Sequence, residues 1–331
     1  MQRRYATPAI AALVAALVMR TAGAQAQPPS RIHRVAVVEY LTEAAVRLVK
    51  DLVLRELNKL GYVERRNLVL EIRSLLGMDP KEQEAVMADV VRTRPDVIVV
   101  AGTNAALRAV KATRSIPVVM WASVDPVAAG LAQSLAHPGG NVTGLVSDVG
   151  AGAEEKRMQL LLELVPRARR IAFVGVQPDW TNPWGAAVRS FAAKRGVVLV
   201  FAEGTGTSDF SRSVEIVRKE KPDAVFVALS GATSQARALF GRMTVETGIP
   251  SVCGIAEMAN DACVMTYGQS SVEFIARSMA YVDRILKGAN AADLPIEQPT
   301  RFQLVINLKL ANQIGLQVPS TLLMRADKVV E

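Results

Sequence analysis

The sequence predicts an α/β protein with two doubly wound lobes, each a parallel sheet of Rossmann-like, flavodoxin-like strand order. From Arg34 onward, short apolar runs alternate with amphipathic segments of ten or more residues, a pattern typical of right-handed βαβ units. Landmarks of the first half then recur in the second half, in the same order. At 331 residues the chain is long enough for two such lobes.

The repeated landmarks are Arg34-Val-Ala-Val-Val and Arg170-Ile-Ala-Phe-Val, Leu60-Gly61 and Arg195-Gly196, Pro95-Asp96 and Pro222-Asp223, and Ile116-Pro117 and Ile249-Pro250. They are separated by 127 to 136 residues, a nearly constant offset. In doubly wound sheets, ligands bind beyond the carboxyl ends of the strands, where the strand order reverses. Two similar lobes therefore predict a binding site in the cleft between them.

The expected elements alternate regularly through the first half. Strands are expected at 35–39, 68–72, 97–101, 116–121 and 142–146, and helices at 44–60 and 81–92. Gly61 ends the first helix as a C′ glycine does. After the second copy, one more helix is expected at 272–287, and then a strand at 302–306 and a helix.

This pattern predicts the domain organisation. We expect an N-terminal lobe of 31–147, which 268–290 joins, and a C-terminal lobe of 148–267. The segment 291–331 belongs to neither repeat and is expected to pack back on one lobe, so the chain crosses between the lobes more than once.

The first 26 residues read as a secretory signal peptide. A positive start, Met1-Gln-Arg-Arg, precedes an apolar run over 8–19, and small-x-small patterns end at Ala24 and Ala26. The run is shorter than the roughly 20 residues that span a bilayer, and Arg20 disfavours a retained anchor. We therefore expect a periplasmic protein, cleaved near Ala24 or Ala26.

Composition excludes several classes of site. Two cysteines and two histidines are too few for a zinc or iron–sulfur centre built from several such ligands, and no cofactor is expected. Three of the basic residues behind the net charge of +8 lie in the first 26 residues, leaving 36 basic against 31 acidic side chains without a Lys/Arg run. Nucleic acid is therefore not an expected partner.

The strongest candidate site residues lie where strands are expected to run into helices. In the first lobe these are Gly102, Thr103 and Asn104, and in the second Ser230 and Thr233. Glycine permits close backbone approach, and a helix N-terminus favours an anionic ligand group. Each hydroxyl or amide alone reads equally well as an N-cap. Their recurrence at the same place in both copies favours a binding site for a small polar ligand.

Further candidates lie in other loops at the strand ends. Asp125 is expected to accept a ligand ammonium or to cap the helix that Pro126 begins. Glu257 carries the same ambiguity, with an exposed loop carboxylate as its alternative. The remaining candidate ligand-binding residues are Tyr40, Ser123, Asn182 and Tyr267. Trp180 and Trp184 either cover a planar ligand or pack within their loop.

The sequence offers little for catalysis. His33 lies at a strand edge and His137 in a turn, and no nucleophile elbow, Walker A loop or dinucleotide fingerprint occurs. We therefore expect a protein that is not an enzyme. Cys253 and Cys263 flank adjacent expected strands, and both a disulfide and two buried thiols remain open.

The chain resembles the substrate-binding proteins of ABC transporters, in the group that includes tryptophan/tyrosine-type binding proteins. The resemblance spans the chain after residue 30 and rests on Leu57-x-x-Leu-Gly-Tyr-Val63, Pro95-Asp-Val-Ile-Val, Asp125-Pro-Val, His137-Pro-Gly-Gly-Asn-Val-Thr-Gly-Leu145, Asp293-Leu-Pro-x-Glu-Gln-Pro-Thr-x-Phe302, Asn307-Leu-Lys309 and Leu323-x-Arg-Ala-Asp327. Glu64-Arg-Arg replaces the usual Glu-Gly-Gln. The resemblance implies a type I periplasmic binding fold, with hinge crossings near Ser147 and Tyr267.

The resulting prediction is the extracytoplasmic solute-binding component of an ABC importer. A monomer would trap a small polar ligand, an amino acid or similar, by hinge closure and deliver it to a membrane permease. The alternative is an enzyme on a similar two-lobe scaffold, such as a nucleotide-sugar epimerase or transferase. That enzyme would need a phosphate-binding glycine loop and a placed base. A transcriptional regulator would need an N-terminal DNA-binding helix pair where the export signal lies.

Overall fold

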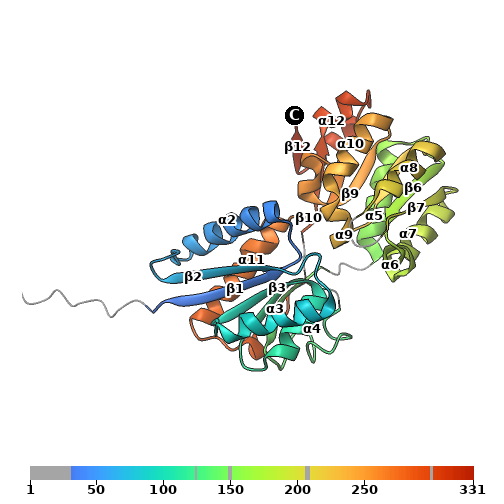
Figure 1. Ribbon diagram of the computed structural model, residues 1–331. Coiled ribbons are helices and arrows are strands. Elements are labelled where there is room, and N and C mark those ends of the chain that lie inside the picture. The colour runs from blue at the N-terminus through green and yellow to red at the C-terminus, as the bar shows by residue number, and fades with distance from the viewer. Residues whose placement is uncertain (1–30, 124, 148–150, 206–208, 299–300) are drawn as a thin grey trace, which may run out of the picture.

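A computed structural model of the chain describes residues 31–123, 125–147, 151–205, 209–298 and 301–331. It shows two α/β lobes placed end to end (Figure 1). The expected signal peptide at 1–26, with its cleavage positions, lies outside the described residues. Among the residues described, no helix is long and apolar enough to cross a membrane.

The first lobe is built on a five-stranded parallel sheet of order β2-β1-β3-β4-β5. Its strands are β1 (His33–Glu39), β2 (Leu68–Ser74), β3 (Val97–Ala101), β4 (Val118–Ser123) and β5 (Val142–Val146). This is the flavodoxin-like order that the sequence predicts. The strand order reverses between β1 and β3, which is the switch point where doubly wound sheets bind ligands.

Helices cover both faces of this sheet. Helices α2 (Glu43–Lys59) and α11 (Ser271–Leu286) pack on one face, where Val53 and Met279 are fully buried with Val37. Helices α3 (Pro80–Arg92) and α4 (Gly102–Ala112) pack on the other face, against Val38 and its neighbours. Because successive residues of a strand point to opposite faces, β1 contributes side chains to the cores on both faces, and its sequence is a continuous apolar run.

The second lobe contains a seven-stranded sheet of order β12-β11-β10-β9-β8-β6-β7. Its strands are β6 (Arg170–Gly175), β7 (Val198–Glu203), β8 (Ala224–Val227), β9 (Ser251–Ile255), β10 (Met265–Gln269), β11 (Gln303–Asn307) and β12 (Lys328–Val330). The part from β7 to β10 repeats the order of the first lobe, with its switch point between β6 and β8. β11 runs antiparallel to β10, the one departure from a parallel sheet among the strands described.

Helices and short turns complete the second lobe. On one face, α5 and α7 share a core with β6 and β11, and on the other α8 and α10 pack against β8 and β9. The elements are α5 (Ala151–Leu164), α6 (Gln177–Thr181), α7 (Pro183–Lys194), α8 (Ser211–Glu220), α9 (Gly231–Gln235), α10 (Arg237–Thr247), η1 (Ala256–Asn260), α12 (Leu308–Gln313) and α13 (Ser320–Leu323).

The chain passes between the lobes three times. It leaves the first lobe after β5, returns between β10 and α11, and leaves again after Glu297, which pairs with Leu145 beside β5. The short η2 (Ala291–Asp293) lies with the first lobe, where Ala291 and Leu294 join its core, whereas β11 and β12 extend the second sheet. The segment 291–331 is therefore shared between the lobes.

Candidate ligand-binding site

The carboxyl ends of β3 and β4 in the first lobe bring two hydroxyl side chains together. Gly102 has a φ of +78°, a conformation that favours glycine, and it turns the chain from β3 directly into α4. The N-cap position is held by Ala101, which has no side-chain acceptor. Thr103 Oγ1 lies 3.1 Å from Oγ of the fully buried Ser123 at the end of β4. The backbone N–H groups and the hydroxyls at this helix end together suit an anionic group.

A cationic side chain lies beside that helix end. Arg108 Nη1 donates to the Asn104 carbonyl oxygen at 3.1 Å and approaches the Tyr40 hydroxyl at 3.5 Å. The Tyr40 hydroxyl donates to Gln83 Oε1 at 3.1 Å, so it is held against α3. Asn104 is itself exposed. Tyr40 and Asn104 thus lie on the same edge of the first lobe, on either side of a positive charge.

Glu39 is a residue of this edge that sequence reasoning missed. It is the last residue of β1, and its Oε2 is buried without a hydrogen-bond partner among the described residues. Burial raises the pKa of this carboxyl from 4.5 to about 8, which favours its protonated form. An ionisable side chain at the end of an apolar strand was the available signal.

The corresponding edge of the second lobe is acidic. Asp179 follows β6 and Ser230 follows β8, so the two residues flank the switch point of the second sheet. Asp179 Oδ2 accepts hydrogen bonds from the Val176 amide at 3.0 Å and from the Ser230 hydroxyl at 3.1 Å. Thr233 is buried and donates its hydroxyl to the Ala228 carbonyl at 2.7 Å. Burial raises the pKa of Asp179 although these hydrogen bonds oppose the shift.

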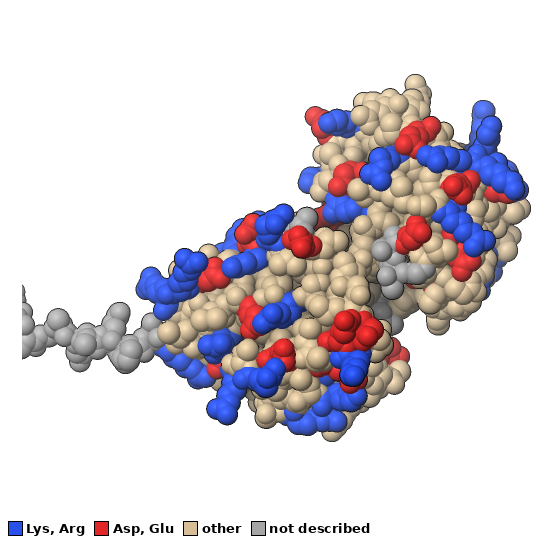
Figure 2. All heavy atoms as spheres, in the orientation of Figure 1, with Lys and Arg blue, Asp and Glu red and all other residues tan. Residues whose placement is uncertain are grey.

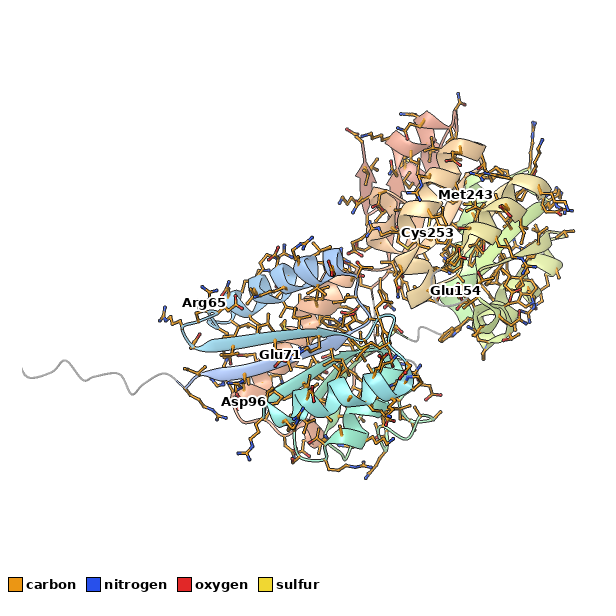
Figure 3. The ribbon with its side chains drawn as sticks, viewed as in Figure 1. Arg65, Glu71, Asp96, Glu154, Met243 and Cys253 are labelled. Carbon is orange, nitrogen blue, oxygen red and sulfur yellow. A yellow bond between two sulfur atoms is a disulfide. The ribbon has the colours of Figure 1, made fainter. Side chains whose placement is uncertain are left out.

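A buried ion pair lies next to Asp179. Arg157 of α5 is 2% exposed, donates to Glu154, and lies 4.6 Å above the Phe226 ring. Gly254 makes room for the guanidinium, because a Cβ at this position would overlap it. Burial raises the pKa of Glu154, as does the charge of Asp179, while Arg157 lowers it. Figure 3 shows Glu154 on the side of the second lobe turned toward the first.

Four other predicted site residues have structural contacts. Asp125 Oδ1 accepts the Ala128 amide at 3.0 Å, and Asn182 Oδ1 caps α7 through the Gly185 amide at 2.7 Å. Tyr267 stacks on Phe302 with ring centroids 5.4 Å apart. Trp180 likewise packs within its own lobe, stacked on Phe201 at 4.8 Å. The expected helix does not begin at Pro126: residues 126–130 form a turn, and Asp125 accepts an amide within it. For Trp180, the packing alternative is the arrangement observed.

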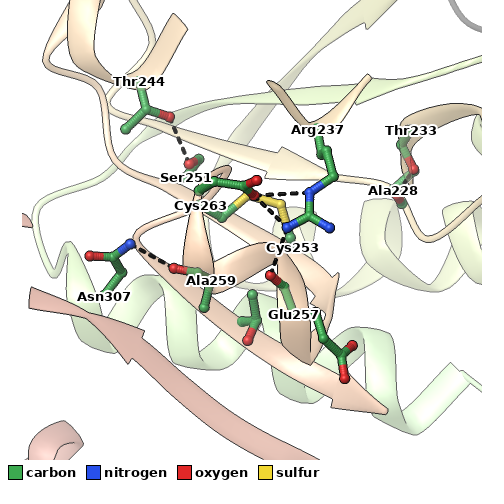
Figure 4. The surroundings of a disulfide bond; sticks show 12 residues. Ala228, Thr233, Arg237, Thr244, Ser251, Cys253, Glu257, Ala259, Cys263 and Asn307 are labelled. Atoms are coloured by element: carbon green, nitrogen blue, oxygen red, sulfur yellow. Dashed lines mark hydrogen bonds and ion pairs between the residues drawn. A yellow bond between two sulfur atoms is a disulfide. The ribbon is translucent and has the colours of Figure 1, made fainter. Parts of the chain in front are cut away.

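Glu257, a fifth candidate residue, lies at the second crossing between the lobes. Its carboxylate accepts the Ser270 hydroxyl at 2.5 Å and the Ser271 amide at 3.0 Å, and so caps α11 from the second lobe. On its other side, Arg237 donates to the Glu257 carbonyl oxygen at 3.1 Å (Figure 4).

The turn that carries Glu257 is also covalently fixed. Cys253 and Cys263 form a disulfide, with Cα atoms 6.0 Å apart, across η1. Asn307 Nδ2 donates to the Ala259 carbonyl at 2.6 Å and ties the same turn to β11. Among the described residues, no group of three or more His, Cys, Asp or Glu side chains is placed to hold a metal ion.

Comparisons with known proteins agree with this architecture. The sequence profile described as ABC transporter substrate binding protein matches residues 34–330. A tyrosine-binding protein of Clostridioides difficile (strain R20291) is 22% identical over 264 residues, which is 80% of this chain and 75% of that protein.

Solved structures show the same fold. A conserved domain protein from Vibrio cholerae has a TM-score of 0.77 at 25% identity, covering 90% of this chain and 100% of its own. An ABC domain from Streptococcus pneumonia in complex with L-Trp has a TM-score of 0.76 at 21% identity, with the same coverage. Since the profile spans nearly all of the described residues, the chain belongs to the ABC transporter substrate binding protein family.

Proposed function

We propose that this protein is a periplasmic, non-catalytic receptor that traps one amino acid with an aromatic side chain between its lobes and delivers it to an ABC permease. One observation carries the proposal. Both lobes place polar side chains at the carboxyl ends of their sheets, Thr103 with the buried Ser123 in the first and Asp179 with Ser230 in the second. The tyrosine-binding relative and the solved complex with L-Trp support this ligand class.

The moving units of the proposal are the two lobes. The first comprises 31–147 with 270–298, and the second 151–269 with 301–331. The recorded hydrogen bonds between described residues of different lobes join parts of the crossings, such as Gln269 Nε2 to the Ser147 carbonyl at 3.4 Å. Contacts at the pivot leave the outer edges free to approach each other around a ligand, as hinge closure requires.

The proposed first-lobe contacts are Gly102, Thr103, Asn104 and Tyr40. The fully buried Ser123 would support Thr103 from within the lobe. The helix end favours the ligand carboxylate, and Tyr40 offers an aromatic surface.

We further propose that the protein is exported as a monomer and that its signal peptide, within residues 1–26, is removed. The positive start, apolar run and small-x-small pattern support it. Mass spectrometry of protein secreted to the periplasm tests it, since the expected mature chain begins just after Ala24 or Ala26.

Thermal unfolding with added solutes tests the ligand class. The purified periplasmic protein is heated with single amino acids, purines, sugars and nucleotide sugars in turn. A ligand at 100 times its Kd adds about 2.7 kcal/mol, which raises the Tm by roughly 5–10 °C for units of this size. L-tyrosine and L-tryptophan are expected to do so, with 1:1 binding by calorimetry. Lack of stabilisation by any amino acid, together with turnover of a nucleotide sugar, would favour the enzyme alternative.

A further inference from the structure

The two facing edges of the lobes differ in electrostatic character. The α4 end of the first lobe carries helix N–H groups, hydroxyls and the cation Arg108, and burial raises the pKa of the nearby Glu39 carboxyl. The second-lobe edge carries a buried cluster of two carboxyl groups, Asp179 and Glu154, and the cation Arg157. A further cation, Arg189, donates to the carbonyl oxygen of Trp180, the residue after Asp179. When both carboxyls are ionised, this buried cluster has an excess of one negative charge.

The position of Asp179 shows how that charge is presented. Its Oδ2 is occupied by the Val176 amide and the Ser230 hydroxyl, which fix the plane of the carboxylate. No hydrogen bond to its Oδ1 is recorded among the described residues. Because this oxygen is not fully buried either, it retains access to solvent. Asp179 therefore offers one fixed, accessible acceptor at the switch point.

The neighbouring ion pair is built into the fold and is incompletely satisfied. Arg157 is 2% exposed, and its Nε has no hydrogen-bond partner among the described residues. Gly254 leaves the space that the guanidinium fills. Arg157 forms its ion pair with Glu154, and among the described residues no ion pair to Asp179 is found. A buried carboxylate in this state is stabilised by an incoming cation.

We propose that Asp179 is the specificity-determining acceptor for a ligand ammonium group, so that the ligand is zwitterionic and lies with its cationic end on the second lobe. Its carboxylate then faces the α4 end of the first lobe, and closure brings the two opposite charges of one ligand onto complementary edges. This assignment rests on the proposed function, and it adds the orientation of the ligand and the residue that binds its ammonium group.

Ligand analogues test the assignment directly. The probes are L-tyrosine, 3-(4-hydroxyphenyl)propanoate, which lacks the ammonium, and tyramine, which lacks the carboxylate. Asp179→Asn keeps an oxygen that can accept from Val176 and Ser230, but removes the charge. It is expected to weaken L-tyrosine binding about 10- to 100-fold, the size of a charge-assisted hydrogen bond. Binding of the propanoate is expected to remain within about twofold.

A matched variant controls for loss of charge. Asp223→Asn removes a carboxylate at the opposite end of the same sheet, where Asp223 accepts the Arg169 and Arg170 amides at 2.7 and 2.9 Å. It is expected to leave both affinities unchanged. Thr103→Ala, on the first lobe, is expected to weaken L-tyrosine and the propanoate alike while sparing tyramine.

The outcomes separate this inference from the proposed function. Equal loss of L-tyrosine and propanoate binding in Asp179→Asn, or no loss of either, overturns the assignment. If the variant does not fold, the wild-type protein still decides, because equal affinity for L-tyrosine and the propanoate overturns it as well. Failure of the wild-type protein to bind any amino acid overturns the proposed function itself.

Discussion

Replacing Glu39 by Gln is expected to change how stability depends on pH. Burial raises the folded-state pKa of Glu39 from 4.5 to about 8. Between these values the unfolded chain has lost the proton while the folded protein retains it, so stability falls as pH rises through this range. Below pH 4.5 both states carry the proton, and above pH 8 the loss is complete. Glu39→Gln removes the titration and with it this fall.

The size of the effect follows from the shift. A change from 4.5 to about 8 corresponds to roughly 4–5 kcal/mol once both states are ionised. The side chain is only half-buried although its Oε2 is fully enclosed, so solvent screening reduces the expected value to about 1–3 kcal/mol. The variant should match the wild-type protein near pH 5 and exceed it near pH 9.

Urea denaturation at pH 5, 7 and 9 measures this difference, read from midpoints at constant slope. The matched control is Glu43→Gln, an exposed carboxylate in the first turn of α2, which should follow the wild-type profile. Parallel pH profiles for Glu39→Gln and the wild-type protein would refute the reasoning, because they would mean that Glu39 titrates alike in the folded and unfolded states.

Three further predictions concern the hinge and the second lobe. Glu257→Gln weakens the cap on α11 and should lower the free energy of unfolding by about 1–2 kcal/mol. It should also change the radius of gyration of the ligand-free protein, measured by X-ray scattering. An unchanged radius of gyration would mean that the lobes pivot elsewhere. Cys263→Ser removes a disulfide with a sequence separation of 10 and should lower the free energy of unfolding by about 2–3 kcal/mol. The reduced wild-type protein should then be as stable as the variant, and a difference between them would contradict this. Arg157→Met leaves Glu154 buried without its cation and should lower the free energy of unfolding by about 3–5 kcal/mol at pH 7. The loss should be smaller at pH 4.5, where Glu154 is more readily protonated. A loss of stability that does not depend on pH, measured by urea denaturation, would contradict an electrostatic origin.

Much of the fold follows from local patterns. The repeat between Arg34 and Arg170 predicts two similar lobes, and alternation of strands with helices predicts the flavodoxin-like order found in both. Element boundaries differ from expectation by a few residues, as for β4, which begins at Val118 and continues to Ser123. The antiparallel β11 lacks a local signal, because its direction depends on how the chain returns from the first lobe.

Part of the candidate site could be predicted and part could not. Thr103 and Ser230 lie at strand-to-helix junctions, which are visible in the sequence as small hydroxyl residues after apolar runs. The importance of Asp179 depends on Ser230, 51 residues away, and the sequence alone presents it as one more carboxylate at a helix start. The sequence leaves Asp125 open between binding and capping, and Glu257 between binding and an exposed position in a loop, because a carboxylate suits each of these uses.

The position of α11 has a consequence for how the protein is made. The helix supplies Ile275, Met279 and Val282 to the core of the first lobe, yet it is synthesised after most of the second lobe. One face of the N-terminal sheet is therefore covered by α2 but not by α11 until residues near 286 have emerged. The first lobe can therefore complete its folding only after most of the second lobe has been synthesised. A chain truncated after β10 would expose apolar surface of the first lobe and would be prone to aggregation.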